Sequence, residues 1–264
     1  MLQLDPGRTE YDLHFRLFGV PVRVHPFFWV AAFLIGFQGG NPKVILVWML
    51  AMFVSILVHE FGHSLTMRRF GTPSRIVLYH FGGVAIPEET DHPAWLPQSP
   101  HNTWQSILIL LAGPGAGFVF AILLAAILKA SGGDFELHLP KLDFYDYWTF
   151  HLPQGIPEII GPPGKEEYSP LYLLCSDLFF INIIWGVFNL LPVIPLDGGQ
   201  IARELLVARD RYLGLSHALQ LSCVVAVIVG LCGFFVLNST YMGFMFLILA
   251  VSNYQTWQQW TRRF

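Results

Sequence analysis

The chain has 264 residues, of which 54% are hydrophobic and only 12% are charged, and its mean hydropathy is +0.52. A water-soluble domain carries about a quarter charged residues, so the composition excludes an ordinary soluble protein and predicts a multi-pass membrane protein. The net charge of −3 gives no reason to expect nucleic acid as a partner. The three cysteines lie in apolar segments without a paired spacing, which favours small buried side chains over a disulfide framework.

Apolar stretches of about 20 residues, the length that crosses a bilayer as a helix, recur along the sequence. We expect an all-α polytopic membrane protein of about six transmembrane helices, which form one membrane-embedded domain over residues 1–264. The first dozen residues are polar, so we expect no cleavable signal peptide. The expected segments lie near residues 26–40, 43–65, 104–130, 171–191, 216–237 and 240–257.

Basic residues set the expected orientation, because cytoplasmic loops carry an excess of lysine and arginine. With a cytoplasmic amino terminus, the expected segments leave eleven basic residues inside and four outside. We therefore expect an integral protein of the cell (inner) membrane with both termini in the cytoplasm and a long external loop over residues 131–170. The inside residues are Arg8, Arg16, Arg23, Arg68, Arg69, Arg75, Arg203, Arg209, Arg211, Arg262 and Arg263, and the outside ones are Lys43, Lys129, Lys141 and Lys165.

Two stretches on the expected cytoplasmic side alternate apolar and polar residues, as half-buried β-strands do. Residues 11–25 alternate around a Phe18-Gly19 turn, and residues 75–86 are expected to form a second hairpin that turns at Gly82-Gly83. Together the two hairpins predict a small cytoplasmic sheet at the membrane surface. Gly82 and Gly83 form either an ordinary turn or part of a free strand edge that binds an extended substrate, and the sequence favours neither interpretation.

Residues His59-Glu60-Phe61-Gly62-His63 form a His-Glu-x-x-His motif directly after residues 44–58, a stretch without a charged residue. Histidines four residues apart lie on one face of a helix, so both imidazoles can bind a single zinc ion. Glu60 is then placed to act as the general base that takes a proton from the attacking water. The alternative is an interfacial cluster that only forms hydrogen bonds, but an unpaired glutamate at this depth is costly. The motif predicts hydrolytic chemistry within a membrane.

A catalytic zinc usually has a third protein ligand and an open position for water, and Asp197 is the candidate. It follows Pro192 and Pro195, which should end the fourth segment, and it precedes Gly198-Gly199, which permits a tight turn. The second and fourth segments are expected to cross the membrane in the same direction. Asp197 and His63 should therefore lie at a similar depth.

The fourth segment carries further polar side chains. Asp177 lies near its outer end, about 20 Å before the proline break, so it is a poor ligand candidate and is better explained as a pairing or packing carboxylate. Asn189, next to the break, is a candidate to hydrogen-bond an extended substrate backbone or to polarise the scissile carbonyl. Asn182 lies seven residues earlier, on the same face of the expected helix, and is interpreted as an interhelical hydrogen-bonding residue.

Glycines near the motif have two possible roles. Gly62 either removes bulk beside the metal or permits close helix packing, and both interpretations stay open. The glycine-rich run from Gly113 to Gly117 is interpreted as a packing surface, because small residues let membrane helices approach closely.

The motif from His59 to His63, followed by Asn189-x-x-Pro-x-x-Pro-Leu-Asp197-Gly198, resembles the site-2 protease family of intramembrane zinc metalloproteases. The similarity extends to Phe81-Gly82-Gly83 and Ala112-Gly113-Pro114, and it covers the chain from about Gly19 to Gly199. The resemblance implies that His59, His63 and Asp197 bind one Zn²⁺ ion and that Glu60 is the general base.

The resemblance also has limits. The chain looks like the compact six-helix type of the family, to which no PDZ-like or CBS-like regulatory domain can be fitted. The family commonly has Asn three residues after the proline of its Gly-Pro motif, where this chain has Gly117. A role of that Asn in contacting substrate is therefore not carried over.

These features predict a zinc-dependent intramembrane endopeptidase that hydrolyses peptide bonds in or near transmembrane segments. Its expected substrate is a single-span membrane protein that is locally unwound and enters laterally from the lipid bilayer. Two alternatives stay open. A proteolytically silent adaptor would bind client helices without cutting them, although loss of Glu60 would be the simplest sign of such a change. A metal-ion transporter would place ionisable groups across the whole bilayer, and the outer halves of the expected segments offer little beyond Asp177.

Overall fold

The computed structural model describes residues 7–37, 41–80, 82–87, 102–137, 148–161, 167–211 and 213–262. The chain falls into two compact units, and each unit is described by itself. The first unit comprises Met1–Pro100, Ala112–Glu136 and Phe150–Gly186, and the second comprises His101–Leu111, Leu137–Thr149 and Val187–Phe264.

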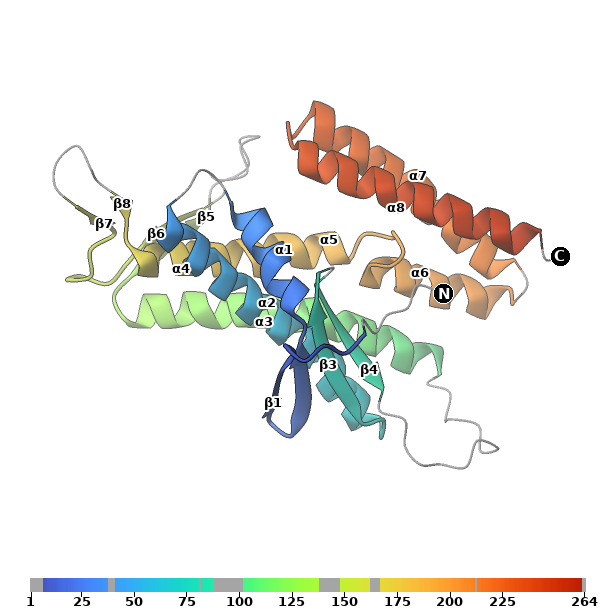
Figure 1. Cartoon of the computed structure of the whole chain (residues 1–264), viewed down its shortest axis with the longest axis horizontal. Coiled ribbons are helices and arrows are strands. Elements are labelled where there is room, and N and C mark those ends of the chain that lie inside the picture. The colour runs from blue at the N-terminus through green and yellow to red at the C-terminus, as the bar shows by residue number, and fades with distance from the viewer. Residues whose placement is uncertain are drawn as a thin grey trace. The chain divides into compact units, whose positions relative to one another are not determined.

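The first unit contains a four-stranded sheet with the strand order β1-β2-β3-β4 (Figure 1). Strands β1 and β2 are antiparallel, β2 and β3 are parallel, and β3 and β4 are antiparallel, so β1 and β4 form the two edges. The expected pair of hairpins is therefore confirmed. The strand bounds are Leu13–Leu17 for β1, Val20–Val24 for β2, Ser74–Tyr79 for β3 and Gly82–Pro87 for β4.

The two hairpin turns differ in how well they match the expectation. The turn between β1 and β2 lies at Phe18 and Gly19, as predicted. The prediction of a second turn at Gly82-Gly83 is wrong, because both glycines lie within β4 and Gly82 is paired with Tyr79. Gly82 has a φ of +115°, which favours glycine, and a side chain on Gly83 would overlap with that of Glu60. These glycines therefore permit an unusual backbone and a close approach within a strand.

Helix α1 spans Pro26–Gly36, which is 11 residues and about 16 Å of helix. Its first turn is capped by His25, whose Nδ1 accepts a hydrogen bond from the backbone N–H of Phe27 at 3.2 Å. This length is too short to cross the hydrocarbon core of a bilayer, which is about 30 Å thick. The described part of the first expected segment is thus not a complete membrane span.

Helix α2 spans Pro42–Arg69 and is 28 residues long, or about 42 Å. Asn41 caps it by accepting a hydrogen bond from the backbone N–H of Lys43 at 3.0 Å. The helix continues four residues beyond the expected end at position 65, and Arg68 and Arg69 stabilise its last turn through the helix dipole. The His-Glu-x-x-His motif therefore lies inside one uninterrupted helix.

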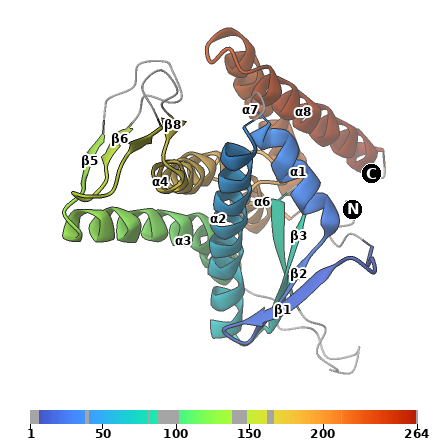
Figure 2. The same ribbon diagram turned by 60° about the vertical axis from the view of Figure 1, so that its left-hand side comes forward.

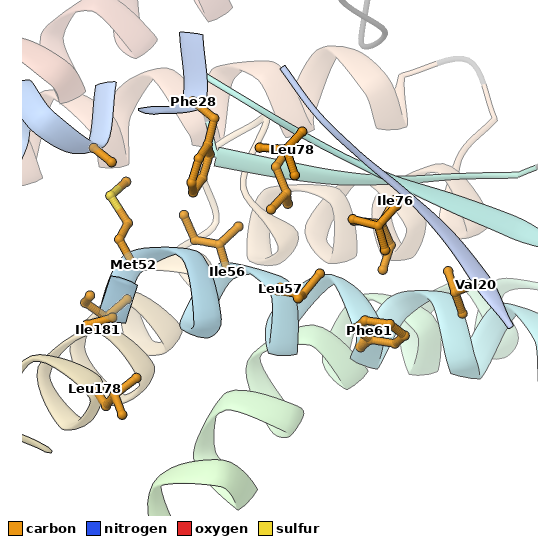
Figure 3. Close-up of a cluster of buried hydrophobic side chains, with 14 residues drawn as sticks. Val20, Phe28, Met52, Ile56, Leu57, Phe61, Ile76, Leu78, Leu178 and Ile181 are labelled. Carbon is orange, nitrogen blue, oxygen red and sulfur yellow. The ribbon is translucent and has the colours of Figure 1, made fainter. Parts of the chain in front are cut away.

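A hydrophobic core joins the sheet to α2 (Figure 3). Alternate residues of the central strands point to the same face because the side chains of a strand alternate in direction. The core also includes residues from the helix that begins at Pro170. Its members labelled in Figure 3 are Val20, Phe28, Met52, Ile56, Leu57, Phe61, Ile76, Leu78, Leu178 and Ile181. This packing holds the sheet against the half of α2 that carries the motif.

Two further apolar helices contribute to both units. Helix α3 spans Thr103–Ala130 and contains Pro114. A second helix runs from Pro170 to Asn189 and consists of α4 (Pro170–Phe180), a π-helical turn η1 (Ile181–Trp185) and α5 (Gly186–Asn189). The connection between α3 and α4 includes two small sheets, one of β5 (Asp134–Leu137) with β6 (Trp148–His151) and one of β7 (Ile159–Ile160) with β8 (Glu167–Tyr168).

The second unit contains helices α6 (Asp197–Arg209), α7 (Gly214–Phe235) and α8 (Thr240–Thr261). Helices α7 and α8 approach closely, since a β-carbon on Gly233 would lie 2.9 Å from the backbone nitrogen of Gly243. The residues before α6 pack on this pair through Val193, which is fully buried with Ala226 and Phe246. Helix α6 was not among the expected elements.

Four helices in the described part of the chain are long and apolar enough to cross a membrane. They are α2, α3, the helix Pro170–Asn189 and α7. The prediction of a mostly helical membrane protein with a small sheet is thus confirmed, whereas the count of six transmembrane helices stays a prediction.

A hydrogen bond between apolar helices links α2 to η1. The side-chain amide of Asn182 donates from Nδ2 to Oγ of Ser55 at 2.8 Å and to the carbonyl of Leu178 at 2.8 Å. Both Asn182 and Ser55 are buried. The interpretation of Asn182 as an interhelical hydrogen-bonding residue is therefore confirmed.

We expect Ser55→Ala to lower the free energy of unfolding by about 0.6–1.7 kcal/mol, from the average to the largest value measured for such bonds between membrane helices. The reason is that the Asn182 amide loses one acceptor in an apolar environment. Unfolding of the detergent-solubilised protein by a denaturing surfactant measures the difference. Ser176→Ala, which removes a half-buried serine hydroxyl on α4, is the matched control. An equal effect of the two substitutions would contradict the assignment.

Candidate metal centre

Three side chains of α2 form the centre of the candidate site. The Nε2 atoms of His59 and His63 are 3.1 Å apart, and the two rings are edge-to-face with centroids separated by 4.8 Å. Both nitrogens are thus close enough to bind one metal ion. Glu60 and His63 are buried and His59 is half-buried. About one and a half turns of a single helix therefore bring together two imidazole nitrogens and a carboxylate.

Helix α3 passes directly beside the two imidazoles. A β-carbon on Gly113 would overlap with the ring of His63 and would lie 2.8 Å from Nε2 of His59. The absence of a side chain at this position leaves space next to both nitrogens. Gly113 was interpreted as a packing residue, but its position shows that it also lies against both imidazoles of the candidate site.

Gly62 has a packing role. A β-carbon at this position would overlap with the carbonyl of Ala112 and lie 2.9 Å from the β-carbon of Ala116. Of the two interpretations left open by the sequence, close packing of α2 on α3 is the one that the contacts support. This close approach brings Gly113 to the imidazoles.

Strand β4 covers Glu60. A β-carbon on Gly83 would lie 2.7 Å from Oε1 and 2.8 Å from Cδ of Glu60, so only a glycine permits this contact. Tyr79, on the neighbouring strand β3, is electrostatically coupled to the same carboxylate. Burial raises the pKa of the Tyr79 phenol, and the charge of Glu60 raises it further. A neutral phenol therefore neighbours Glu60 at neutral pH. Tyr79 was not a candidate at the level of the sequence.

Asp197 is the first residue of α6 and is half-buried. The turn that precedes it is very tight, since β-carbons on Gly198 and Gly199 would overlap with backbone atoms of Leu190 and Val193. The peptide bond between Ile194 and Pro195 is cis. The expectation of a tight turn at Gly198-Gly199 is therefore wrong, because both glycines lie in the first turn of α6. They instead let the preceding turn pack closely on the start of this helix.

Two polar residues of the second unit hold this turn. Oγ of Ser222 accepts a hydrogen bond from the backbone N–H of Ile194 at 3.1 Å, and Nδ2 of Asn253 donates to the Ile194 carbonyl at 2.6 Å. Both side chains are buried, Ser222 in the apolar helix α7 and Asn253 in α8. Sequence reasoning missed them, although a buried polar residue in such a helix is a signal that a partner exists.

The π-helical turn changes the relation between Asn182 and Asn189. The prediction that they share one helix face assumes a regular α-helix, but residues Ile181–Trp185 form i→i+5 hydrogen bonds. Each residue of such a wider turn advances by a smaller angle, so a spacing of seven no longer places two residues on the same face. Asn189 is buried at the end of α5.

Position 117, where Asn was expected from the resemblance, lies against Asn182. A β-carbon on Gly117 would be 3.2 Å from Oδ1 of Asn182. A side chain at position 117 would therefore begin beside the side-chain amide of Asn182. Asp177 lies in the second half of α4, about 18 Å of helix before Asn189.

The sequence model of Peptidase family M50 matches residues 47–232, which is more than half of the chain. The chain belongs to Peptidase family M50. The matched region includes the His-Glu-x-x-His motif of α2 and the Asp197 turn. The resemblance inferred from those two motifs is thereby confirmed.

The curated relatives include proteins that are named as zinc metalloproteases. The chain is 26% identical over 202 residues to "Zinc metalloprotease MJ0392" of Methanocaldococcus jannaschii, which covers 75% of this chain and 46% of that protein. It is 25% identical over 244 residues to "Stage IV sporulation protein FB" of Bacillus subtilis, with 90% and 66% covered. The chain spans about half the length of most of the curated relatives that it matches.

A solved structure supports the fold of this M50 member. The "Site-2 Protease from Methanocaldococcus jannaschii" superposes with a TM-score of 0.51 at 22% sequence identity, and the match covers 94% of both chains. At this identity the likeness concerns the fold alone.

Proposed function

We propose that this M50 member is a zinc-dependent intramembrane endopeptidase that cleaves peptide bonds in or near transmembrane segments. The observation that carries the proposal is the arrangement in α2, where two imidazole nitrogens 3.1 Å apart flank a buried glutamate within an apolar helix of 28 residues. Family membership and the names of the relatives support the same reaction class.

The proposed zinc ligands are His59, His63 and Asp197. Two imidazoles and one carboxylate with an open fourth position are a donor set that suits catalytic zinc. The space beside both Nε2 atoms, kept free by Gly113, fits an ion of this kind. The position of Asp197 at the start of α6, in a turn held by two hydrogen bonds, supports its assignment as a ligand of fixed orientation.

When bound, zinc lowers the pKa of a coordinated water and polarises the scissile carbonyl. Glu60 is proposed to accept the proton of the attacking water and then to donate it to the leaving amine. The carboxylate is suited to this role because it neighbours His59 in sequence and because β4 restricts its position. Asn189 is proposed to hydrogen-bond the substrate backbone next to the cleaved bond.

The edge strand β4 is the proposed place of substrate binding. A transmembrane helix must unwind before it can be cut, and an extended peptide can add to a strand edge. Gly82 and Gly83 belong to β4, and Gly83 contacts the proposed general base. A peptide that pairs with this edge would run close to Glu60.

The proposed substrates are single-span membrane proteins that enter laterally from the bilayer. We further propose six membrane segments in the cell (inner) membrane, in which the segments expected near residues 26–40 and 240–257 join the four apolar helices. Helix α1 is then the described part of the first segment. Both termini and the sheet are then cytoplasmic, which agrees with the positive-inside distribution of arginines. Residues 131–170 form the external connection.

The test is cleavage of a tagged single-span model substrate by the purified protein in liposomes. We expect cleavage by the wild-type protein, loss of cleavage when a chelator removes zinc, and recovery when zinc is returned. Zinc content is measured on the same samples. Binding of the substrate without any product, at full zinc content, would instead support a silent adaptor. Zinc flux into the liposomes would support a transporter.

A further inference from the structure

A cavity of about 220 Å³ lies where the first turns of α2 and α4 meet strand β8. Figure 2 shows the start of α2 beside β8 and the start of α4. The cavity is separate from the candidate metal centre, because Val44 precedes His59 by 15 residues, or about 22 Å of helix. Its lining includes the apolar side chains of Val44, Val47 and Leu173 and the charged side chains of Lys43 and Glu167.

The cavity lies at one end of two apolar helices that run in the same direction. Nδ2 of Asn41, before α2, donates a hydrogen bond to Oε2 of Glu167, before α4, at 3.2 Å. Further along both helices, Asn182 contacts Ser55. Helix α2 and the helix that begins with α4 are both long and apolar enough to cross a membrane. Their shared end therefore marks a boundary of the bilayer, which is the depth of the lipid headgroups.

The two charged side chains of the cavity have opposite signs and are both exposed. Within the part of the chain that the structure describes, Lys43 and Glu167 form no ion pair with each other or with another residue. Asn41 holds one carboxylate oxygen of Glu167 and leaves Oε1 available. The cavity thus offers a cation and an anion at separate places beside an apolar wall, which fits a ligand that carries both charges and an apolar part.

We propose that this cavity binds the headgroup of phosphatidylethanolamine. The ammonium of Lys43 binds the lipid phosphate, and Oε1 of Glu167 accepts a hydrogen bond from the ethanolamine ammonium. Val44, Val47 and Leu173 contact the glycerol and the first carbons of the acyl chains. The bound lipid would join α2 to β8 and α4 at the end of α2 that lies away from the candidate metal centre.

Other membrane ligands fit the cavity less well. Phosphatidylglycerol has no cation for Glu167, and the methylated nitrogen of phosphatidylcholine has no N–H to donate. Choline is usually held by a cage of aromatic rings, whereas Tyr168 is the one aromatic residue among the described lining residues. Its ring is stacked on Tyr172, with centroids 4.7 Å apart and an interplanar angle of 12°. A transmembrane helix that packed here would leave both charges unpaired.

The first test measures the affinity of the purified protein for each lipid by titration in detergent and native mass spectrometry. We expect the wild-type protein to bind dioleoyl phosphatidylethanolamine at least about tenfold more tightly than dioleoyl phosphatidylcholine or phosphatidylglycerol. The reason is that a hydrogen bond to a charged group contributes enough free energy for a tenfold difference. Equal affinities for the three lipids would overturn the proposal.

Substitutions at the two charged positions should have different effects. We expect Glu167→Gln to remove the preference for phosphatidylethanolamine over phosphatidylcholine, because the ammonium loses its anionic partner. Lys43→Gln should weaken the binding of both lipids about tenfold and leave the preference in place. Glu10→Gln and Lys129→Gln, which change exposed residues outside the cavity, are the matched controls. A preference that survives Glu167→Gln would place the lipid elsewhere and overturn the proposal.

The second test uses the wild-type protein alone. A phosphatidylethanolamine with a photoreactive group at the top of one acyl chain is added to nanodiscs, and mass spectrometry maps the crosslinks. We expect crosslinks at Val44, Val47 and Leu173 that excess unlabelled phosphatidylethanolamine suppresses and excess phosphatidylcholine does not. Ile122 of α3, which is 67% exposed, should be labelled to the same extent whichever lipid competes. Equal suppression by both lipids at the cavity would overturn the proposal.

Discussion

Replacement of Glu60 by glutamine is expected to lower the rate of substrate cleavage by about a thousandfold while the bound zinc is retained. General acid–base catalysis by one side chain typically contributes about 10²–10⁴ to a rate. Glutamine preserves the shape of the side chain and its contact with Gly83 but cannot accept a proton. The measurement is the turnover of the model substrate in liposomes, together with zinc content.

The matched control for this experiment is Glu10→Gln, which removes an exposed carboxylate outside the candidate site. We expect its cleavage rate to equal that of the wild type. Cleavage by Glu60→Gln at close to the normal rate, with zinc bound, would show that Glu60 is not the base. Loss of zinc from Glu60→Gln would assign the residue to metal binding or to folding of the site instead.

The central part of the site could be predicted because it is local in sequence. His59, Glu60 and His63 lie on one helix, and helical periodicity alone brings the two imidazoles together. The structure adds what periodicity cannot supply, namely the elements that surround this face. Gly113 and Gly83 come from different elements, and a glycine in a sequence does not reveal which side chain lies opposite it.

The error at Gly82-Gly83 illustrates the same limit. Two adjacent glycines between alternating stretches are a normal signal of a turn. Here one glycine provides a left-handed backbone inside a strand, and the other provides space for Glu60. Both requirements depend on tertiary contacts, so the pattern identified the hairpin but placed its turn two residues late.

Helix boundaries were predictable where polar residues mark them. Asn41 before Pro42 marks the start of α2. The expected end at position 65 fell four residues short, although Arg68 and Arg69 mark the observed end. The first expected segment was extended too far because aromatic residues raise its hydropathy, whereas α1 ends at Gly36. The π-helical turn at Ile181–Trp185 has no hydropathy signal at all, so the relation between Asn182 and Asn189 could not be read from their spacing.

Helix α6 was missed although its sequence carries recognisable signals. An acidic residue, Asp197, occupies its first turn and a basic residue, Arg209, its last turn, which suits the helix dipole. The search for long apolar segments passed over this shorter amphipathic helix. Its start matters for function, because it fixes the backbone of the residue proposed as the third zinc ligand.

Substitution of Gly113 by alanine should lower the affinity for zinc by about 10–100-fold, the range found when residues that support metal ligands are changed. The new methyl group would overlap with the His63 ring and approach His59, so the two imidazoles would have to move apart. Gly115→Ala is the matched control on α3, since a β-carbon there meets no atom within 4 Å. Alanine favours a helix over glycine by about 1 kcal/mol at either position.

Intrinsic helix propensity therefore cancels between the two variants, and only the overlap with the imidazoles differs. Competition with a fluorescent zinc indicator measures the affinity, and unfolding by a denaturing surfactant shows whether each variant stays folded. We expect Gly115→Ala to bind zinc as the wild type does. Equal affinities for both variants would mean that α3 lies further from the imidazoles than the structure shows. A loss of zinc confined to Gly113→Ala, with stability unchanged, would establish that the proximity of α3 shapes the metal centre.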